Sequence, residues 1–246
     1  MDSIYAKFLL ILNLFLAVSC DDFPNTPELI DKFRTMGVGL ADPSYTYSTD
    51  STPVTAALSF YFATPSDASI TADNVEVDSQ TIELTFSAPV LVEAKATLNI
   101  YKVDATANIP VESALIFNPA EEDTATVSYA AIFLQGSEEE RVFGKIRIYR
   151  PTVASSSEVT TPTATILEPV DGDSVSGSIE LSGEVGNKIV ESYRSSWLVS
   201  SGTIEKFRDR EAEWVDAKKG SQTVIFTVRG LDSFNFNYTA IDVTVN

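Results

Sequence analysis

Residues 54–63 read VTAALSFYFA, and this stretch decides the fold class. The run mixes β-branched, aromatic and small residues without a charge, and residues 64–67 (TPSD) close it with a turn signal. A short apolar run of this composition, bounded by Pro, Ser and Asp, is typical of a β-strand in a buried sheet. We therefore expect a β-rich chain.

Period-two patterns continue downstream of this strand. They predict strands at residues 81–86 and 96–103, and a hairpin of residues 127–134 and 142–149 around a loop at residues 136–140. Upstream, Thr26 and Pro27 resemble a helix start, so residues 26–33 are expected to form at most a turn or two of helix. Short strands with frequent turns predict an all-β fold of the sandwich type.

The pattern is interrupted by residues 151–164 (PTVASSSEVTTPTA), which have the Ser, Thr and Pro content of a semi-extended linker. Seven or so further strands follow in residues 165–246. We therefore expect two β-sandwich domains, at residues 33–150 and 165–246, with residues 20–32 as a tether before the first domain.

The second domain carries a resemblance. Residues 166–179 (ILEPVDGDSVSGSI) and 193–204 (YRSSWLVSSGTI) are similar to bacterial Ig-like and PKD-like modules of surface lipoproteins. Residues 28–38 resemble the first segment of lipoproteins from predatory and gliding Gram-negative bacteria. The resemblance implies two immunoglobulin-like β-sandwiches, a Trp197 packed in the core and a final strand pair at residues 224–230 and 241–245, and it transfers no catalytic residue.

The N-terminus has the features of a secretory signal. Lys7 precedes an apolar run at residues 8–18, which is too short to span a bilayer. Residues 16–20 (LAVSC) resemble the lipobox of bacterial lipoproteins, which implies removal of residues 1–19 and acylation of Cys20. The lone Cys of the chain lies where that motif requires it. We expect a lipid-anchored envelope protein held by acyl chains on Cys20, at the outer membrane or alternatively the inner membrane, periplasmic or surface-exposed.

The composition excludes several classes of function. The chain of 246 residues has no His and one Cys, which leaves no His-dependent catalytic triad and no thiolate zinc cage. Its net charge of −18 argues against binding a nucleic-acid backbone. No cofactor motif is present, and we expect no cofactor other than, as an alternative, calcium.

Acidic residues supply the candidate metal ligands. Asp171 and Asp173 flank Gly172, and Asp209 and Glu211 flank Arg210; both pairs offer oxygen ligands of the type that calcium prefers, without the spacing of a calcium-binding loop. A hydrolase built on two carboxylates would need a defined pair, and no pair is singled out by the sequence. We expect no catalytic residue.

Aromatic residues near the C-terminus supply a candidate contact surface. Phe234, Phe236 and Tyr238 alternate in the opposite phase to Ile241 and the valines that follow it. A continuous strand cannot turn both sets to one face. Two alternatives remain open: a β-bulge near residues 239–240 resets the phase, or the aromatic side chains face outward and contact a protein or a sugar.

These observations predict a non-catalytic display, adhesion or scaffold protein of the cell envelope, whose partner is another envelope protein or a glycan. The alternative is a carbohydrate- or calcium-binding accessory lipoprotein, followed by a carboxylate-based hydrolase.

Overall fold

The computed structural model describes residues 29–40, 45–46, 54–65, 67–78, 81–111, 115, 124–149, 161–186, 193–230 and 235–246. Within these ranges every regular element is a β-strand, which confirms the prediction of an all-β chain. Cys20 and Phe234 lie outside the described residues, as do residues 151–160 of the expected linker.

Nine strands of the described residues form the N-terminal sandwich. One sheet has the order β1-β3-β7-β5, with β6 also paired to β7, and the other has the order β2-β9-β8-β4. The strands are β1 (Arg34–Leu40), β2 (Tyr45–Thr46), β3 (Val54–Thr64), β4 (Ile70–Asn74), β5 (Leu84–Phe86), β6 (Val90–Ala94), β7 (Asn99–Ile109), β8 (Thr124–Gln135) and β9 (Glu138–Tyr149).

In the C-terminal sandwich the structure describes eight strands. Its sheets have the orders β10-β12-β15-β14 and β11-β17-β16-β13. The strands are β10 (Thr163–Glu168), β11 (Ser174–Val175), β12 (Ile179–Gly186), β13 (Tyr193–Val199), β14 (Thr203–Glu205), β15 (Glu211–Val215), β16 (Gly220–Gly230) and β17 (Phe236–Val245).

Each sandwich has its own apolar core. In the N-terminal domain the aromatic residues of the opening stretch fill it, because Phe60 and Phe62 of β3 are fully buried against Phe133 of β8. In the C-terminal domain Trp197 of β13 and Trp214 of β15 are fully buried. The indole of Trp214 donates a hydrogen bond to the carbonyl of Ser201 at 2.7 Å, which satisfies the polar atom of this buried ring. The expected core position of Trp197 is confirmed.

Three local expectations are corrected. Residues 29–33 are not helical: Leu29 forms a parallel bridge with Val199, and β1 follows at once. The hairpin turn consists of Gly136 and Ser137 alone, so residues 138–140 belong to β9. Thr163 and Ala164, which we assigned to the linker, belong to β10.

The two glutamates at the start of β9 hold this N-terminal segment in place. Glu138 accepts a hydrogen bond from the backbone N–H of Phe33 at 2.7 Å, and Glu140 accepts one from the Thr35 hydroxyl at 3.4 Å. Burial raises the pKa of the Glu140 carboxyl, and the nearby Arg34 opposes that shift. These glutamates fall in the loop expected at residues 136–140; in the structure they connect the two sheets.

Gly144 of β9 offers a test of the N-terminal core. A Cβ atom at this position would lie 2.1 Å from the Tyr129 hydroxyl oxygen, which belongs to a buried ring. Gly144→Ala is therefore expected to lower the free energy of unfolding by about 1–3 kcal/mol through overpacking.

The measurement is urea denaturation of the full chain. Gly39→Ala in β1 is the matched control, because its nearest neighbour would lie at 3.6 Å, an ordinary contact distance. Equal stability of the two variants would contradict the packing of Tyr129 over Gly144.

Candidate functional site

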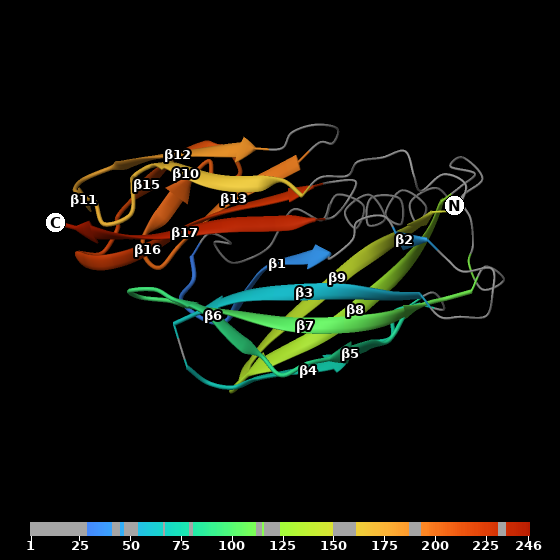
Figure 1. Cartoon of the computed structure of the whole chain (residues 1–246). Coiled ribbons are helices and arrows are strands. Elements are labelled where there is room, and N and C mark those ends of the chain that lie inside the picture. The colour runs from blue at the N-terminus through green and yellow to red at the C-terminus, as the bar shows by residue number, and fades with distance from the viewer. Residues whose placement is uncertain are drawn as a thin grey trace, which may run out of the picture.

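The two sandwiches are packed against one another through the outer faces of two sheets (Figure 1). Seven residues make up this interdomain junction, and all are at most 9% exposed. They are Ile30, Ala63, Leu98 and Ile100 from the N-terminal part, and Leu198, Ile225 and Ala240 from the C-terminal domain. Sequence analysis predicted two domains but not their packing. Because β3, β7, β13, β16 and β17 are covered on both faces, the chain forms four stacked sheets.

The junction explains the opposite phases of the last strand. β16 and β17 pair without a register shift from Arg229↔Phe236 to Gly220↔Val245, so the expected bulge is absent. Ile241 and its phase partners face the C-terminal core, whereas Ala240 and Tyr238 face the junction. The aromatic residues do point to the opposite face, but Phe236 is only 6% exposed and Tyr238 is half-buried. Neither forms the open contact surface that we considered.

Gly37 of β1 lets the N-terminal domain approach Phe236. A Cβ atom on Gly37 would lie 2.2 Å from the Phe236 ring, so only glycine allows this distance. Tyr61 of β3 packs against both Phe236 and Tyr238, with ring centroids 5.5 and 5.6 Å apart. Phe236 and Tyr238 therefore contact the N-terminal domain of the same chain.

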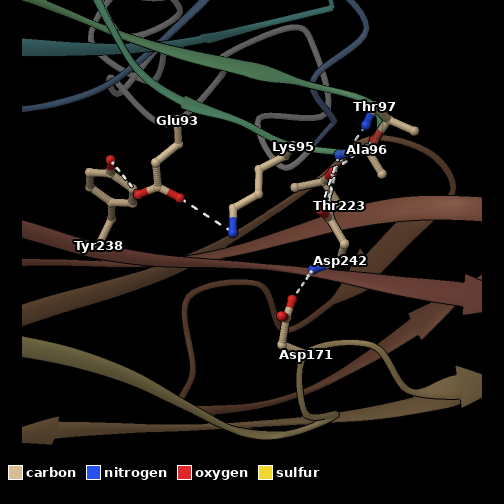
Figure 2. A network of polar contacts seen from close by, with 8 residues as sticks. All are labelled: Glu93, Lys95, Ala96, Thr97, Asp171, Thr223, Tyr238 and Asp242. Carbon is tan, nitrogen blue, oxygen red and sulfur yellow. Dashed lines mark hydrogen bonds and ion pairs between the residues drawn. The ribbon is translucent and has the colours of Figure 1, made fainter.

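Polar contacts border the apolar junction (Figure 2). Tyr238 donates a hydrogen bond to Glu93 at 3.0 Å, and Glu93 forms an ion pair with Lys95 at 3.3 Å. Burial raises the pKa of the Tyr238 phenol, and the negative charge of Glu93 raises it further.

Asp242 of β17 is the centre of a second polar group in Figure 2. Its carboxylate accepts hydrogen bonds from the Ala96 N–H at 3.1 Å and from the Thr223 hydroxyl at 2.7 Å. Thr223 is also bonded to the Thr97 hydroxyl at 2.9 Å. These contacts attach the turn before β7, which belongs to the N-terminal domain, to the C-terminal domain.

The candidate calcium ligands are not brought together. Asp171 accepts a hydrogen bond from the Asp242 N–H at 2.9 Å, and Asp173 accepts one from the Val170 N–H, also at 2.9 Å. Asp209 and Glu211 line two different hollows. In the described part of the chain, no group of three or more His, Cys, Asp or Glu side chains is placed to hold a metal ion.

Glutamates form a row on the outer face of the sheet β10-β12-β15-β14. Glu180, Glu213 and Glu205 are direct neighbours on three adjacent strands, and they line a hollow of about 670 Å³. This face is therefore strongly acidic, although like charges in direct opposition destabilise a sheet.

A groove of opposite charge lies beside the junction. It has a volume of about 730 Å³ and is lined by Met36 and Gly37 of β1 together with residues of the C-terminal domain. Four arginines line it, which is half of the eight arginines in the whole sequence, with a single acidic residue, Asp209. They are Arg194 of β13, Arg208 and Arg210 of the loop before β15, and Arg229 of β16. We call this surface the arginine groove.

The loop that carries Arg208 and Arg210 is fixed by buried groups of the core. The Trp197 indole donates a hydrogen bond to the Asp209 carbonyl at 2.9 Å, and the Ser195 hydroxyl donates one to the Arg208 carbonyl at 3.2 Å. The Gly183 N–H donates to the Arg210 carbonyl at 2.8 Å. The backbone of both arginines is thus held in place by the protein itself.

The strand order in both domains agrees with one known arrangement. Without the short strands β2 and β11 and the side strand β6, each domain has seven strands. In each domain the first, second, fifth and fourth of these form one sheet, and the third, sixth and seventh form the other. Both domains are Ig-like β-sandwiches. The buried Trp197 lies on β13, the third strand of this seven-strand count, which is the position of the conserved tryptophan in immunoglobulin domains.

No family model matches the chain, and no curated protein matches it. Among solved structures, the PKD domain of human KIAA0319 is 19% identical, with 37% of this chain and 88% of that chain covered and a TM-score of 0.29. The fibronectin(III)-like modules of CbhA from Clostridium thermocellum are 12% identical, with 85% and 94% covered and a TM-score of 0.34. A chimeric titin Z1Z2 tandem is 10% identical, with 87% and 99% covered and a TM-score of 0.27. At these identities the similarity concerns the fold alone.

The arginine groove was not foreseen from the sequence. Its four arginines are spread over residues 194–229, and three strands must pair before they lie on one surface. The run Arg208-Asp209-Arg210 was the available signal, and we interpreted its Asp as a calcium ligand. No helix in the described ranges is long and apolar enough to cross a membrane.

Ile100→Asp tests the junction. Ile100 is fully buried between the domains, and an unpaired carboxylate there would favour separation of the two sandwiches, since separation hydrates the charge. We expect the wild-type chain to unfold in a single calorimetric transition and the variant to unfold in two, one for each domain.

Val90→Asp is the control, because Val90 is 53% exposed on the neighbouring strand β6. The control is expected to keep one transition. A single transition in Ile100→Asp, at an unchanged temperature, would show that the domains do not depend on this contact.

Tyr238 predicts a dependence of stability on alkaline pH. Its pKa is raised in the folded protein, so the folded state keeps the proton that the unfolded state loses near pH 10. The stability contributed by this group is complete below about pH 10 and is lost as the pH rises above it.

Urea denaturation at about pH 8 and about pH 10.5 measures the effect. Tyr238→Phe is expected to lose less stability between these two pH values than the wild-type chain. Tyr101→Phe, which removes a phenol outside the Tyr238–Glu93 contact, serves as control and should behave as the wild type. Identical losses in all three chains would contradict the prediction.

Proposed function

We propose that the protein is a non-catalytic, lipid-anchored protein of the cell envelope that acts in adhesion or as a scaffold by displaying two Ig-like domains as one body. The observation that carries the proposal is the interdomain junction. Two independent sandwiches on a linker would move relative to one another, whereas domains that share an apolar interface present fixed surfaces to a partner. A fixed display of this kind suits contact rather than catalysis.

The position of the anchor supports the same function. Cys20, the proposed acylated residue, precedes the junction residue Ile30 by ten positions. Ten residues span at most about 35 Å even when fully extended. The junction would therefore lie close to the membrane surface, and both domains would be held there without a long stalk. Two or three acyl chains would make the attachment effectively permanent.

The charge of the chain is compatible with display at a membrane. A net charge of −18 keeps a protein soluble at high local density and discourages non-specific association. The exposed acidic groups include the glutamate row of β12, β15 and β14.

Metabolic labelling with a fatty-acid analogue tests the anchor. The wild-type chain is expected to incorporate the label and to fractionate with the envelope, and Cys20→Ala is expected to do neither. Thr26→Ala is the control, since it alters a nearby residue without removing the thiol. A labelled Cys20→Ala chain, or an unlabelled wild type, would refute the lipid anchor.

A further inference from the structure

We propose that the arginine groove binds an acidic polysaccharide, a chain of sugars that carry carboxylate or sulfate groups. The inference deepens the proposed contact function and rests on it, but it does not depend on the lipid anchor. Three features of the groove carry it: its charge, its fixed loop and the chemistry of its lining.

The charge of the groove is opposite to that of the protein. Four guanidinium groups and one carboxylate give a local excess of three positive charges in a chain whose net charge is −18. Within the described residues, none of these four arginines forms an ion pair, although other described cations such as Lys95 and Lys102 do. All four are exposed. Guanidinium groups bind carboxylate and sulfate oxyanions through paired hydrogen bonds, so the groove offers unused donors to an anion.

The groove is preorganised. Hydrogen bonds from Trp197, Ser195 and Gly183 fix the backbone of the loop that carries Arg208 and Arg210. Arg194 and Arg229 lie directly opposite one another on the paired strands β13 and β16. Binding an anion therefore requires ordering of the arginine side chains but not of their backbone, which reduces the entropic cost of association.

The distribution of charge favours an extended ligand over a single ion. The arginines come from β13, from the loop before β15 and from β16, so the positive charge is spread over three segments of the lining. Hydroxyl groups and aromatic rings complete the lining, among them Ser196, Thr227 and Tyr193. An acidic polysaccharide carries both anionic groups and neutral hydroxyl groups along its chain, so it offers partners to both parts of this lining.

Backbone pairing distinguishes a polysaccharide from an acidic peptide. An extended peptide gains affinity mainly by adding a strand to a free sheet edge. The edge of β13 beside the groove is engaged, because the Trp197 N–H donates a hydrogen bond to the Phe207 carbonyl at 2.8 Å. The groove thus offers side-chain donors and rings rather than a free strand edge there, which favours a sugar chain.

Isothermal titration calorimetry of the full chain in detergent tests the proposal. The probes are polygalacturonate, dextran sulfate, neutral dextran, polyglutamate and inorganic phosphate. We expect binding of polygalacturonate or dextran sulfate, with the difference between them identifying carboxylate or sulfate as the preferred group. Neutral dextran is expected not to bind, and affinity should fall with added salt because the contacts are ionic.

Arg208→Gln/Arg210→Gln removes two of the guanidinium groups and is expected to weaken binding at least about tenfold, since each charged hydrogen bond contributes appreciably. Arg141→Gln is the matched control: Arg141 pairs with Glu139 on β9, away from the groove, and its loss should change the affinity less than about twofold. Arg194→Gln provides a second groove variant, and the melting temperature of each variant confirms folding.

Three titration results would overturn the proposal. They are an absence of binding by both acidic polysaccharides, an equal loss of affinity in Arg141→Gln, and binding of polyglutamate or phosphate as tight as that of the polysaccharides. Self-association through the glutamate row of a second copy, detected by analytical ultracentrifugation and abolished by Arg208→Gln/Arg210→Gln, would also overturn it. The result of labelling at Cys20 does not depend on the result of titrating the groove, so the anchor and the ligand are tested separately.

Discussion

Contact between two sheet faces that would otherwise be exposed constrains this molecule more than any other interaction. A β-strand has two faces, and in an isolated sandwich one of them meets water. Here Ile100 of β7 and Ile225 of β16 are apolar on the face that points away from their own domain core, and both are fully buried. Each sandwich therefore needs the other to cover this face, and the two domains stack as four sheets (Figure 1).

The junction also determines where the charged surfaces lie. Phe236 approaches β1 only because Gly37 has no side chain, and the same approach places Met36 and Gly37 at the wall of the arginine groove. The glutamate row lies on the other sheet of the C-terminal sandwich, where no second domain covers it. A chain with a large negative charge thus has one concave surface of positive charge, and a fixed interface shapes it.

Much of the fold could be predicted from local patterns. The strand at residues 54–63, the hairpin of β8 and β9 and the last two strands follow from alternation and turn residues, because these signals depend on neighbours in sequence. The helix expected at residues 26–33 was wrong for the described residues 29–33, since tertiary contacts override a capping signal: Ile30 and Phe33 are buried in extended chain. The bulge expected near residues 239–240 was wrong for a related reason. That prediction assumed that the last strand buries only one face, whereas both faces of β17 are covered.

By itself, the sequence determined the all-β class and the division into two sandwiches, because alternation of side chains reports which residues avoid water, and the resemblance of residues 193–204 placed Trp197 in the core. It also provides the motif around Cys20, on which the proposed anchor depends. Only the tertiary structure decided what covers the second apolar face of β7, β16 and β17, and that Arg194, Arg208, Arg210 and Arg229 share one groove. The physical reason is that alternation records burial without naming the partner, and residues far apart in sequence become neighbours only through strand pairing and domain contact.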